Sequence, residues 1–286
     1  MIIVPNTTLK TMTGFLSNGE SVMPSAKPAV PKVNMRVALL LSGLCEGQPA
    51  GDGNKAITTT DWKLCYANII ETLVSPYQAD VFVHTWASAG VQNMLNAYHP
   101  KDYTVESPPT FNKFFSQETT QQHSGDFQAF SKSAYSPLTY VPGRTFNQMY
   151  GMEKACFLKR KYEVQNNFKY DMVIRCRFDL KFNVPIKLEA NKLSFMTWES
   201  TAPGVVDMFF AGPTKDMDTI CSVYDHMYEL YLDNEFSDGL KQSGFGCLHL
   251  YSSHAMLRYY LCQQGLYNSI VYPGWHWGKE IEIVRA

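Results

Sequence analysis

The stretch Tyr170-Asp171-Met172-Val173-Ile174-Arg175-Cys176-Arg177-Phe178-Asp179-Leu180-Lys181-Phe182 decides the fold. Its even positions are apolar or aromatic, and its odd positions are charged except Val173. This period of two is typical of a β-strand whose faces meet different environments, so we predict one strand over residues 170–182. Arg175, Arg177 and Asp179 would then share one face, with neighbours about 6.6 Å apart at a rise of about 3.3 Å per residue.

Two guanidinium groups and a carboxylate on one strand face have two interpretations. They lie on a solvated face of the sheet, or they line a polar cleft in which each charge has a partner, because burial of an unpartnered Arg is costly. The elements that surround this strand favour the cleft.

Two apolar runs precede it and define a parallel sheet. Residues 35–41 and 79–86 are typical of strands buried on both faces, and residues 62–74 between them repeat apolar side chains at helical spacing. We expect a threonine of residues 58–60 to cap this helix and Ser75-Pro76 to end it. Strand, helix and strand in this order predict a parallel pair with a right-handed crossover, and ligands of such sheets bind beyond the carboxyl ends of the strands.

Ser42-Gly43 and His84-Thr85-Trp86 stand at those carboxyl ends. The glycine-rich loop after Gly43 leads to a helix N-terminus, where phosphate is favoured. The glycine spacing matches neither the dinucleotide-binding fingerprint nor the P-loop. The alternatives are a plain tight turn at Ser42 and Gly43 and simple packing of His84 and Trp86.

Further strands and helices follow in the remaining sequence. Residues 98–143 are predicted to form long surface loops with short helices that shape a cleft, apart from a strand at 102–106. A capping box at Thr145-Phe146-Asn147-Gln148 predicts a helix up to residue 167, which delivers the chain into the 170–182 strand by another crossover. The other predicted elements are strands at 192–198 and 205–212, a helix from 216, a helix over 248–264 and a strand over 266–272.

Two features of the later strands carry possible chemistry. Asp207 is the one carboxylate in an apolar strand, and because an unpaired buried carboxylate is costly, it needs a partner or a task. The simpler interpretation is a hydrogen-bonded carboxylate at a strand start. Trp275 and Trp277 near the C-terminus could stack on sugar rings or only pack the tail.

Composition excludes several classes of function. The 286 residues carry a net charge of -1, which predicts neither a nucleic-acid partner nor an anionic membrane surface. Seven well-separated cysteines without a C-x-x-C pair predict reduced core thiols and no structural zinc. Neither a membrane span nor a signal peptide is recognisable, so we expect a cytoplasmic protein. Residues 1–34 are predicted to be a flexible lead-in and residues 35–286 a single domain.

The order of elements resembles glycosyltransferases of GT-A type, and within them a group found in large DNA viruses of algae and in some microbes. The resemblance spans about residues 36–265, and its most specific part is the Arg-x-Arg-x-Asp strand. The matching motifs are Ser42-Gly43, the Asp-Val-Phe-x-His-Thr-Trp strand at 80–86, Gln148-Met149-Tyr150-Gly151, the Tyr-Asp-x-Val-Ile-Arg-x-Arg-x-Asp-Leu strand at 170–180 and the Asp-x-Phe-x-x-Gly strand at 207–212.

The resemblance implies an α/β fold, Rossmann-like, with a mixed, mostly parallel sheet flanked by helices. It implies an enzyme that transfers a hexose or deoxyhexose from a nucleoside-diphosphate-sugar donor to a hydroxyl of a glycan or glycoprotein acceptor, in the host cytoplasm if the protein is viral. The residues that would bind the donor are Ser42, Gly43, His84, Trp86, Arg175, Arg177 and Asp179.

Asp179 has a further expected role, because GT-A enzymes usually end this strand in Asp-x-Asp, which holds a divalent cation at the diphosphate. Here the triplet is Arg177-Phe178-Asp179. Either Asp179 still carries Mn²⁺ or Mg²⁺, which is the favoured expectation, or Arg175 and Arg177 neutralise the diphosphate directly.

An inverting enzyme also needs a base for the acceptor proton, and Asp207 is the first candidate, ahead of His254 and Asp225. Inversion and retention both stay open. The alternative function is a catalytically inactive GT-A-fold protein with a glycan-binding or structural role. A hydrolase of the donor would use the same site with water admitted.

Overall fold

The computed structural model describes residues 35–47, 59–107, 142–197, 205–232 and 253–286, all within one compact unit, Met35–Ala286. The predicted lead-in over residues 1–34 lies outside the described residues.

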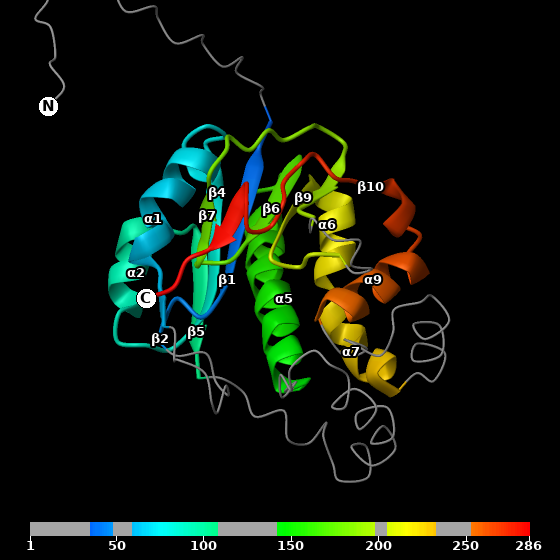
Figure 1. Ribbon diagram of the computed structural model, residues 1–286, viewed down its shortest axis with the longest axis horizontal. Helices are drawn as coiled ribbons and strands as arrows, with labels where there is room; N and C mark the ends of the chain where they lie inside the picture. Colours follow the sequence, from blue (N-terminus) through cyan, green and yellow to red (C-terminus); the bar gives the residue numbers. More distant parts are fainter. Residues whose placement is uncertain (1–34, 48–58, 108–141, 198–204, 233–252) are drawn as a thin grey trace, which may run out of the picture. The chain divides into compact units, whose positions relative to one another are not determined.

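A seven-stranded sheet forms the centre of the unit, in the order β10-β8-β9-β6-β1-β4-β5 (Figure 1). Its strands β1, β4, β5 and β6 are parallel, β9 is antiparallel to both β6 and β8, and β10 is parallel to β8. The prediction of a mixed, mostly parallel sheet is confirmed. The strand bounds are Val37–Gly43 (β1), Asp80–Trp86 (β4), Asp102–Glu106 (β5), Met172–Cys176 (β6), Leu193–Phe195 (β8), Phe209–Pro213 (β9) and Ile270–Val271 (β10).

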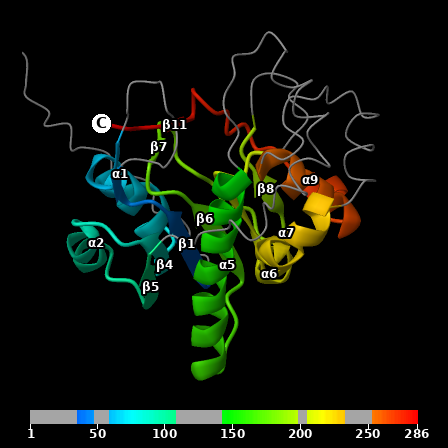
Figure 2. The ribbon, with the colours of Figure 1, turned by 90° about the horizontal axis from the view of Figure 1, so that it is seen from below.

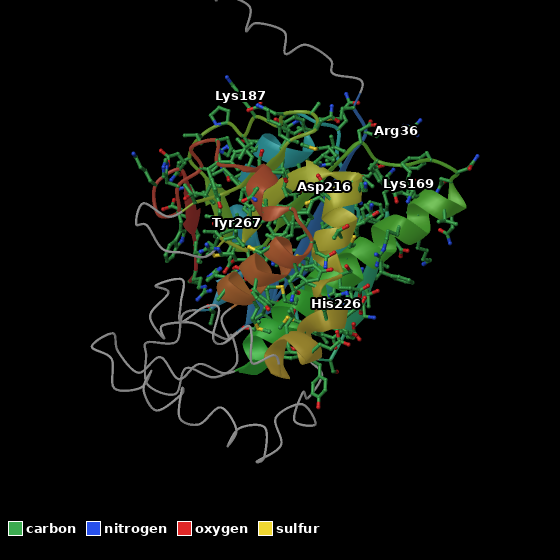
Figure 3. The ribbon with its side chains drawn as sticks, turned by 90° about the vertical axis from the view of Figure 1, so that its right-hand side faces the viewer. Arg36, Lys169, Lys187, Asp216, His226 and Tyr267 are labelled. Carbon is green, nitrogen blue, oxygen red and sulfur yellow. The ribbon has the colours of Figure 1, made fainter. Side chains whose placement is uncertain are left out.

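Helices cover both faces of this sheet (Figure 2). Alternation along β1 shows why, because Ala38 and Leu40 join the apolar cluster under α5, α6, α7 and α9, whereas Leu39 and Leu41 join the cluster under α1 and α2. Figure 3 looks onto the first group, with Asp216 labelled on α6 and His226 on α7. The helix bounds are Lys63–Ile69 (α1, continued by the π-helix Ile70–Val74), Val91–Tyr98 (α2), Pro142–Gln165 (α5), Thr214–Cys221 (α6), Val223–Leu232 (α7) and Ser253–Gln263 (α9).

The long strand predicted over residues 170–182 is wrong in its second half. β6 ends at Cys176, and after a turn the chain forms β7, Leu180–Phe182, which pairs with β11, Ile281–Ile283, in a separate two-stranded sheet (Figure 2). Within the turn, Phe178 is buried against Tyr98, with ring centroids 6.2 Å apart. In this turn Phe178 is buried and Arg177 folds back onto Asp179, so the chain leaves the strand. Arg175, Arg177 and Asp179 therefore do not share one strand face.

Both predicted helix caps are also wrong. Asp61, and not a threonine, accepts the hydrogen bond from the Lys63 amide at 3.0 Å, while Thr60 pairs with Gly47 in a short antiparallel ladder of β3, Thr60–Asp61, and β2, Glu46–Gly47. The α5 helix already begins at Pro142, whose fixed φ suits a first helical position, so Thr145 is buried within it.

Other boundaries moved for local reasons. The helix predicted from residue 216 is two helices that meet at Ser222, and α9 ends before Gly265, whose φ of +69° is the expected stop. The strand predicted over 266–272 is mostly a 3-10 turn, Tyr267–Ser269, before β10. The strand 205–212 begins only at Phe209, and α2 was not predicted. Trp198, residues 248–252 and most of the predicted long loop lie outside the described residues.

The described residues bear on two predictions made from composition, the state of the cysteines and the membrane span. All six cysteines in it are free, and five of them are buried, as expected for core thiols; Cys247 falls outside it. None of the described helices has the length and apolar character to span a membrane.

Candidate functional site

One edge of the sheet gathers most of the residues that the sequence singled out. The carboxyl ends of β1, β4, β5 and β6 lie on it, and because β9 is antiparallel to β6 with Phe209 opposite Cys176, the residues just before β9 lie there too. Ser42, Trp86, Arg177 and Asp207 therefore come to the same edge, as predicted for ligand binding in an open α/β sheet.

Asp207 lies in a tight turn immediately before β9 and is buried, with 2% of its surface exposed. Gln148 of α5 donates a hydrogen bond from Nε2 to its Oδ2 at 2.6 Å. Nδ1 of His254, the second residue of α9, lies 3.0 Å from its Oδ1. The His254 side chain is 26% exposed, so it is the member of the pair that reaches solvent.

Each partner of this pair stabilises the charged form of the other. Burial alone would raise the pKa of Asp207, but His254 and the guanidinium of Arg175 hold that pKa well below its usual range. Burial alone would likewise lower the pKa of His254, but the charge and hydrogen bonding of Asp207 outweigh it and raise that pKa. The result is an oriented imidazole whose Nδ1 faces a carboxylate.

Arg175 supports the site from behind. It is buried, and its Nη1 donates a short hydrogen bond to the carbonyl oxygen of Met208, in the turn that carries Asp207. Burial lowers the pKa of Arg175 to about 10, so it remains charged at neutral pH. Nε of the same guanidinium is buried without a hydrogen-bond partner, and the expected contact of Arg175 with a donor phosphate stays a prediction.

Asp179 holds two guanidinium groups. Arg177 makes a forked contact, Nε to Oδ1 at 2.8 Å and Nη2 to Oδ2 at 2.5 Å, and Nε of Arg285 donates to Oδ2 at 3.3 Å. Burial would raise the pKa of Asp179, but the two arginines lower it. Sequence reasoning missed Arg285, because no local pattern links residues so far apart in the chain.

The chemistry of Asp179 bears on the expected metal. Both of its oxygens already accept hydrogen bonds from guanidinium groups. Within the described ranges, no group of three or more His, Cys, Asp and Glu side chains could hold a metal ion. Mn²⁺ or Mg²⁺ at Asp179 would have to compete with these guanidinium groups and take its other ligands from water and a substrate phosphate, so the expected metal stays a prediction.

A second polar group lies at the ends of β4 and β5. The buried His84 has its Nε2 2.9 Å from Oε1 of Glu106, and the hydroxyl of Tyr150 donates to the same oxygen at 3.0 Å. Burial lowers the pKa of His84 more than Glu106 raises it. The rings of Trp86 and Tyr150 stack with centroids 5.9 Å apart. His84 and Trp86 thus pack inward, and sequence reasoning missed the partners Glu106 and Tyr150.

The remaining candidates divide between core and surface. Ser42 is buried, whereas Gly43 has a φ of +126° and open space where a side chain would stand, so its backbone is approachable. Trp275 is buried against Phe209, and Trp277 is exposed. Asp225 lies on the exposed side of α7.

No protein-family model matches the chain, and no curated protein is significantly similar to it in sequence.

Proposed function

We propose that the protein is a glycosyltransferase that moves a sugar from a nucleoside-diphosphate-sugar donor to a hydroxyl of a glycan or glycoprotein acceptor. The observation that carries this proposal is the pair of buried Asp207 and partly exposed His254 at the carboxyl edge of the sheet. The motifs that resemble GT-A enzymes meet at this edge, and Arg177 is near enough to influence the pKa of His254.

The geometry suggests which group takes the acceptor proton. Asp207 is too buried to touch an acceptor, so we assign it the task of positioning His254 through Nδ1. The acceptor oxygen attacks the anomeric carbon, its proton passes to the imidazole of His254, and the bond from that carbon to the phosphate oxygen breaks with its electron pair leaving on the diphosphate. A raised pKa makes His254 a stronger base, and the Asp207 carboxylate stabilises the imidazolium that forms.

One observation favours the alternative, a GT-A-fold protein that binds glycans without turnover. The position at which GT-A enzymes usually have the first carboxylate is Arg177, and the remaining carboxylate, Asp179, is neutralised by two arginines. Such a protein would need neither an oriented imidazole nor a donor diphosphate site.

A calorimetric screen of nucleotide sugars, with and without Mn²⁺, tests the proposal, followed by an assay of nucleoside-diphosphate release with glycan acceptors. We expect one class of nucleotide sugar to bind and His254→Gln to abolish most of the transfer. His226→Gln is the matched control, because His226 is a partly exposed histidine on α7 whose loss should leave transfer unchanged. Binding of glycans but of no nucleotide would replace the proposal with the alternative.

A further inference from the structure

Arg177 and Arg285 present an unusual arrangement at the carboxyl edge. Their side chains are 21% and 30% exposed, whereas the carboxylate between them is almost completely buried. Asp179 contacts each guanidinium through part of its donors only, and each arginine side chain is partly exposed. The buried carboxylate fixes the direction of both guanidinium groups, as supporting hydrogen bonds orient the side chains that bind a ligand.

The hydrogen-bond donors of these two arginines are only partly used. Arg177 engages Nε and Nη2 with Asp179, and Arg285 engages only Nε. Within the described residues, Nη1 of Arg177 and both terminal nitrogens of Arg285 have no hydrogen-bond acceptor. Guanidinium groups with unused donors favour an anion with several oxygens, and phosphate groups match their planar geometry.

The backbone holds Arg285 firmly in this place. On one side of it, the amide of Val284 donates to the carbonyl oxygen of Asp179 at 2.8 Å. On the other side, Ala286 and Thr59 exchange two backbone hydrogen bonds of 2.9 Å each. The preceding strand β11 pairs with β7, which follows Asp179 directly. Backbone hydrogen bonds therefore bring Arg285 to the site. They come from the pairing of β11 with β7 and from the Ala286–Thr59 contact.

The local charge balance also favours an anion. Three arginines, at positions 175, 177 and 285, stand against two carboxylates, Asp179 and Asp207, which leaves one positive charge, or two when His254 is protonated. A divalent cation at Asp179 would have to displace guanidinium groups from both carboxylate oxygens. The site has instead the charge that a leaving diphosphate requires.

We propose that Arg177 and Arg285, oriented by Asp179, bind the diphosphate group of the donor directly, and that this binding needs no divalent cation. The inference rests on the proposed function, because it takes the donor to be a nucleoside diphosphate sugar. It assigns Arg285 to the donor site and makes Asp179 a positioning residue in place of a metal ligand.

Calorimetry with inorganic pyrophosphate, UDP and GDP tests the proposal, in buffers that contain either EDTA or Mn²⁺. We expect pyrophosphate and one of the nucleoside diphosphates to bind in EDTA with nearly the same affinity as in Mn²⁺. Arg285→Gln should weaken this binding about tenfold to a hundredfold, the effect of losing a hydrogen bond to a charged group. The variant should fold, because Arg177 still neutralises Asp179.

Lys181→Gln is the matched control for this experiment. Lys181 is a cation on the neighbouring strand β7 that pairs with Glu282 at 3.0 Å, so its loss changes the net charge equally and should leave the affinity unchanged. Asp179→Asn should weaken binding to the same extent in EDTA and in Mn²⁺, whereas a metal ligand would matter only in Mn²⁺. Binding seen only with Mn²⁺, or wild-type affinity in Arg285→Gln, would overturn the inference.

These outcomes are distinguishable from failure of the proposed function. Sugar transfer that depends on Mn²⁺ would leave the glycosyltransferase proposal standing and remove the metal-free site. Diphosphate binding in EDTA that is sensitive to Arg285→Gln, without transfer of any sugar, would keep the anion site and remove the transferase.

Discussion

Nδ1 of His254 lies 3.0 Å from Oδ1 of the buried Asp207, although the two residues stand 47 positions apart in the chain. The turn before β9 supplies the carboxylate, and the first turn of α9 supplies the imidazole. Gln148 of α5 holds the second carboxylate oxygen, so three separate elements define the direction in which His254 faces solvent.

The first prediction concerns the rate of sugar transfer. His254→Gln should lower kcat by about two to four orders of magnitude, the range that a positioned general base contributes. In the wild type, kcat should rise with pH as His254 loses its proton, with a midpoint above 6.5 because Asp207 raises the pKa. The kcat of the variant should lack this step, and a step of equal size in both proteins would contradict the assignment.

Asp207→Asn provides the companion measurement. The amide cannot stabilise the imidazolium, so the midpoint of the pH profile should move to lower pH while kcat falls. A purely structural role of Asp207 would lower activity without moving the midpoint. Asp216→Asn on α6 is a suitable control, because it removes a carboxylate elsewhere in the protein.

The second prediction concerns stability, for which His254 and His84 should act in opposite directions. The folded-state pKa of His254 is raised above 6.5, so its contribution is complete below about pH 6.5 and is lost as pH rises through the folded-state pKa. Urea denaturation should therefore show that His254→Gln costs more free energy of unfolding at mildly acidic pH than at alkaline pH. An equal cost at both would show that the imidazole is not charged in the folded protein.

The third prediction follows from the lowered pKa of His84. Below about pH 6.5 the His84 imidazole takes up a proton in the unfolded chain but stays neutral in the folded protein. The folded protein therefore loses stability as pH falls. His84→Gln should flatten this part of the stability profile even though it costs stability at pH 8, where the bond to Glu106 is lost. Melting temperatures of both proteins across this pH range test the slope, and parallel curves would refute it.

The strands of the parallel part of the sheet could be predicted from local sequence patterns alone. β1, β4 and β5 match the predicted strands within two residues, and the first two are almost entirely buried and mostly apolar. Such runs report burial on both faces without reference to distant residues. The antiparallel pairing of β9 could not be predicted in the same way. It depends on the distant strand that lies next to Phe209, and the residue pattern within β9 does not identify that strand.

The site was predictable in its residue types but not in its contacts. The alternation over residues 170–182 singled out Arg175, Arg177 and Asp179, yet it could not show that the chain turns after Cys176 and places Arg175 behind the site. The partner of Asp179 at the C-terminus depends on the pairing of β11 with β7, a contact across about a hundred residues. Local patterns carry no information on such a pairing.

The fourth prediction concerns Lys159, whose ammonium group is completely buried between α5 and α6. It lies 3.2 Å from Oε1 of Glu163 and 2.8 Å from Oδ1 of Asp218. Lys159→Met keeps the volume but leaves Asp218 without its lysine partner and Glu163 with Lys169 alone, so the free energy of unfolding should fall by about 3 kcal/mol in urea denaturation. Lys161→Met is the matched control, because this exposed lysine pairs with Asp102 at the surface and should contribute about 1 kcal/mol or less.

Glu163 extends the consequence of that substitution to the sheet. Its Oε1 also accepts a hydrogen bond of 2.9 Å from the amide of Tyr170, two residues before β6. Without the Lys159 ammonium, the Glu163 carboxylate should shift toward Lys169, and the Tyr170 amide should then exchange its hydrogen faster than in the control variant. If exchange at Tyr170 stays slow while stability falls, the ion pair supports only the contact between α5 and α6, and the entry into β6 is held by other means.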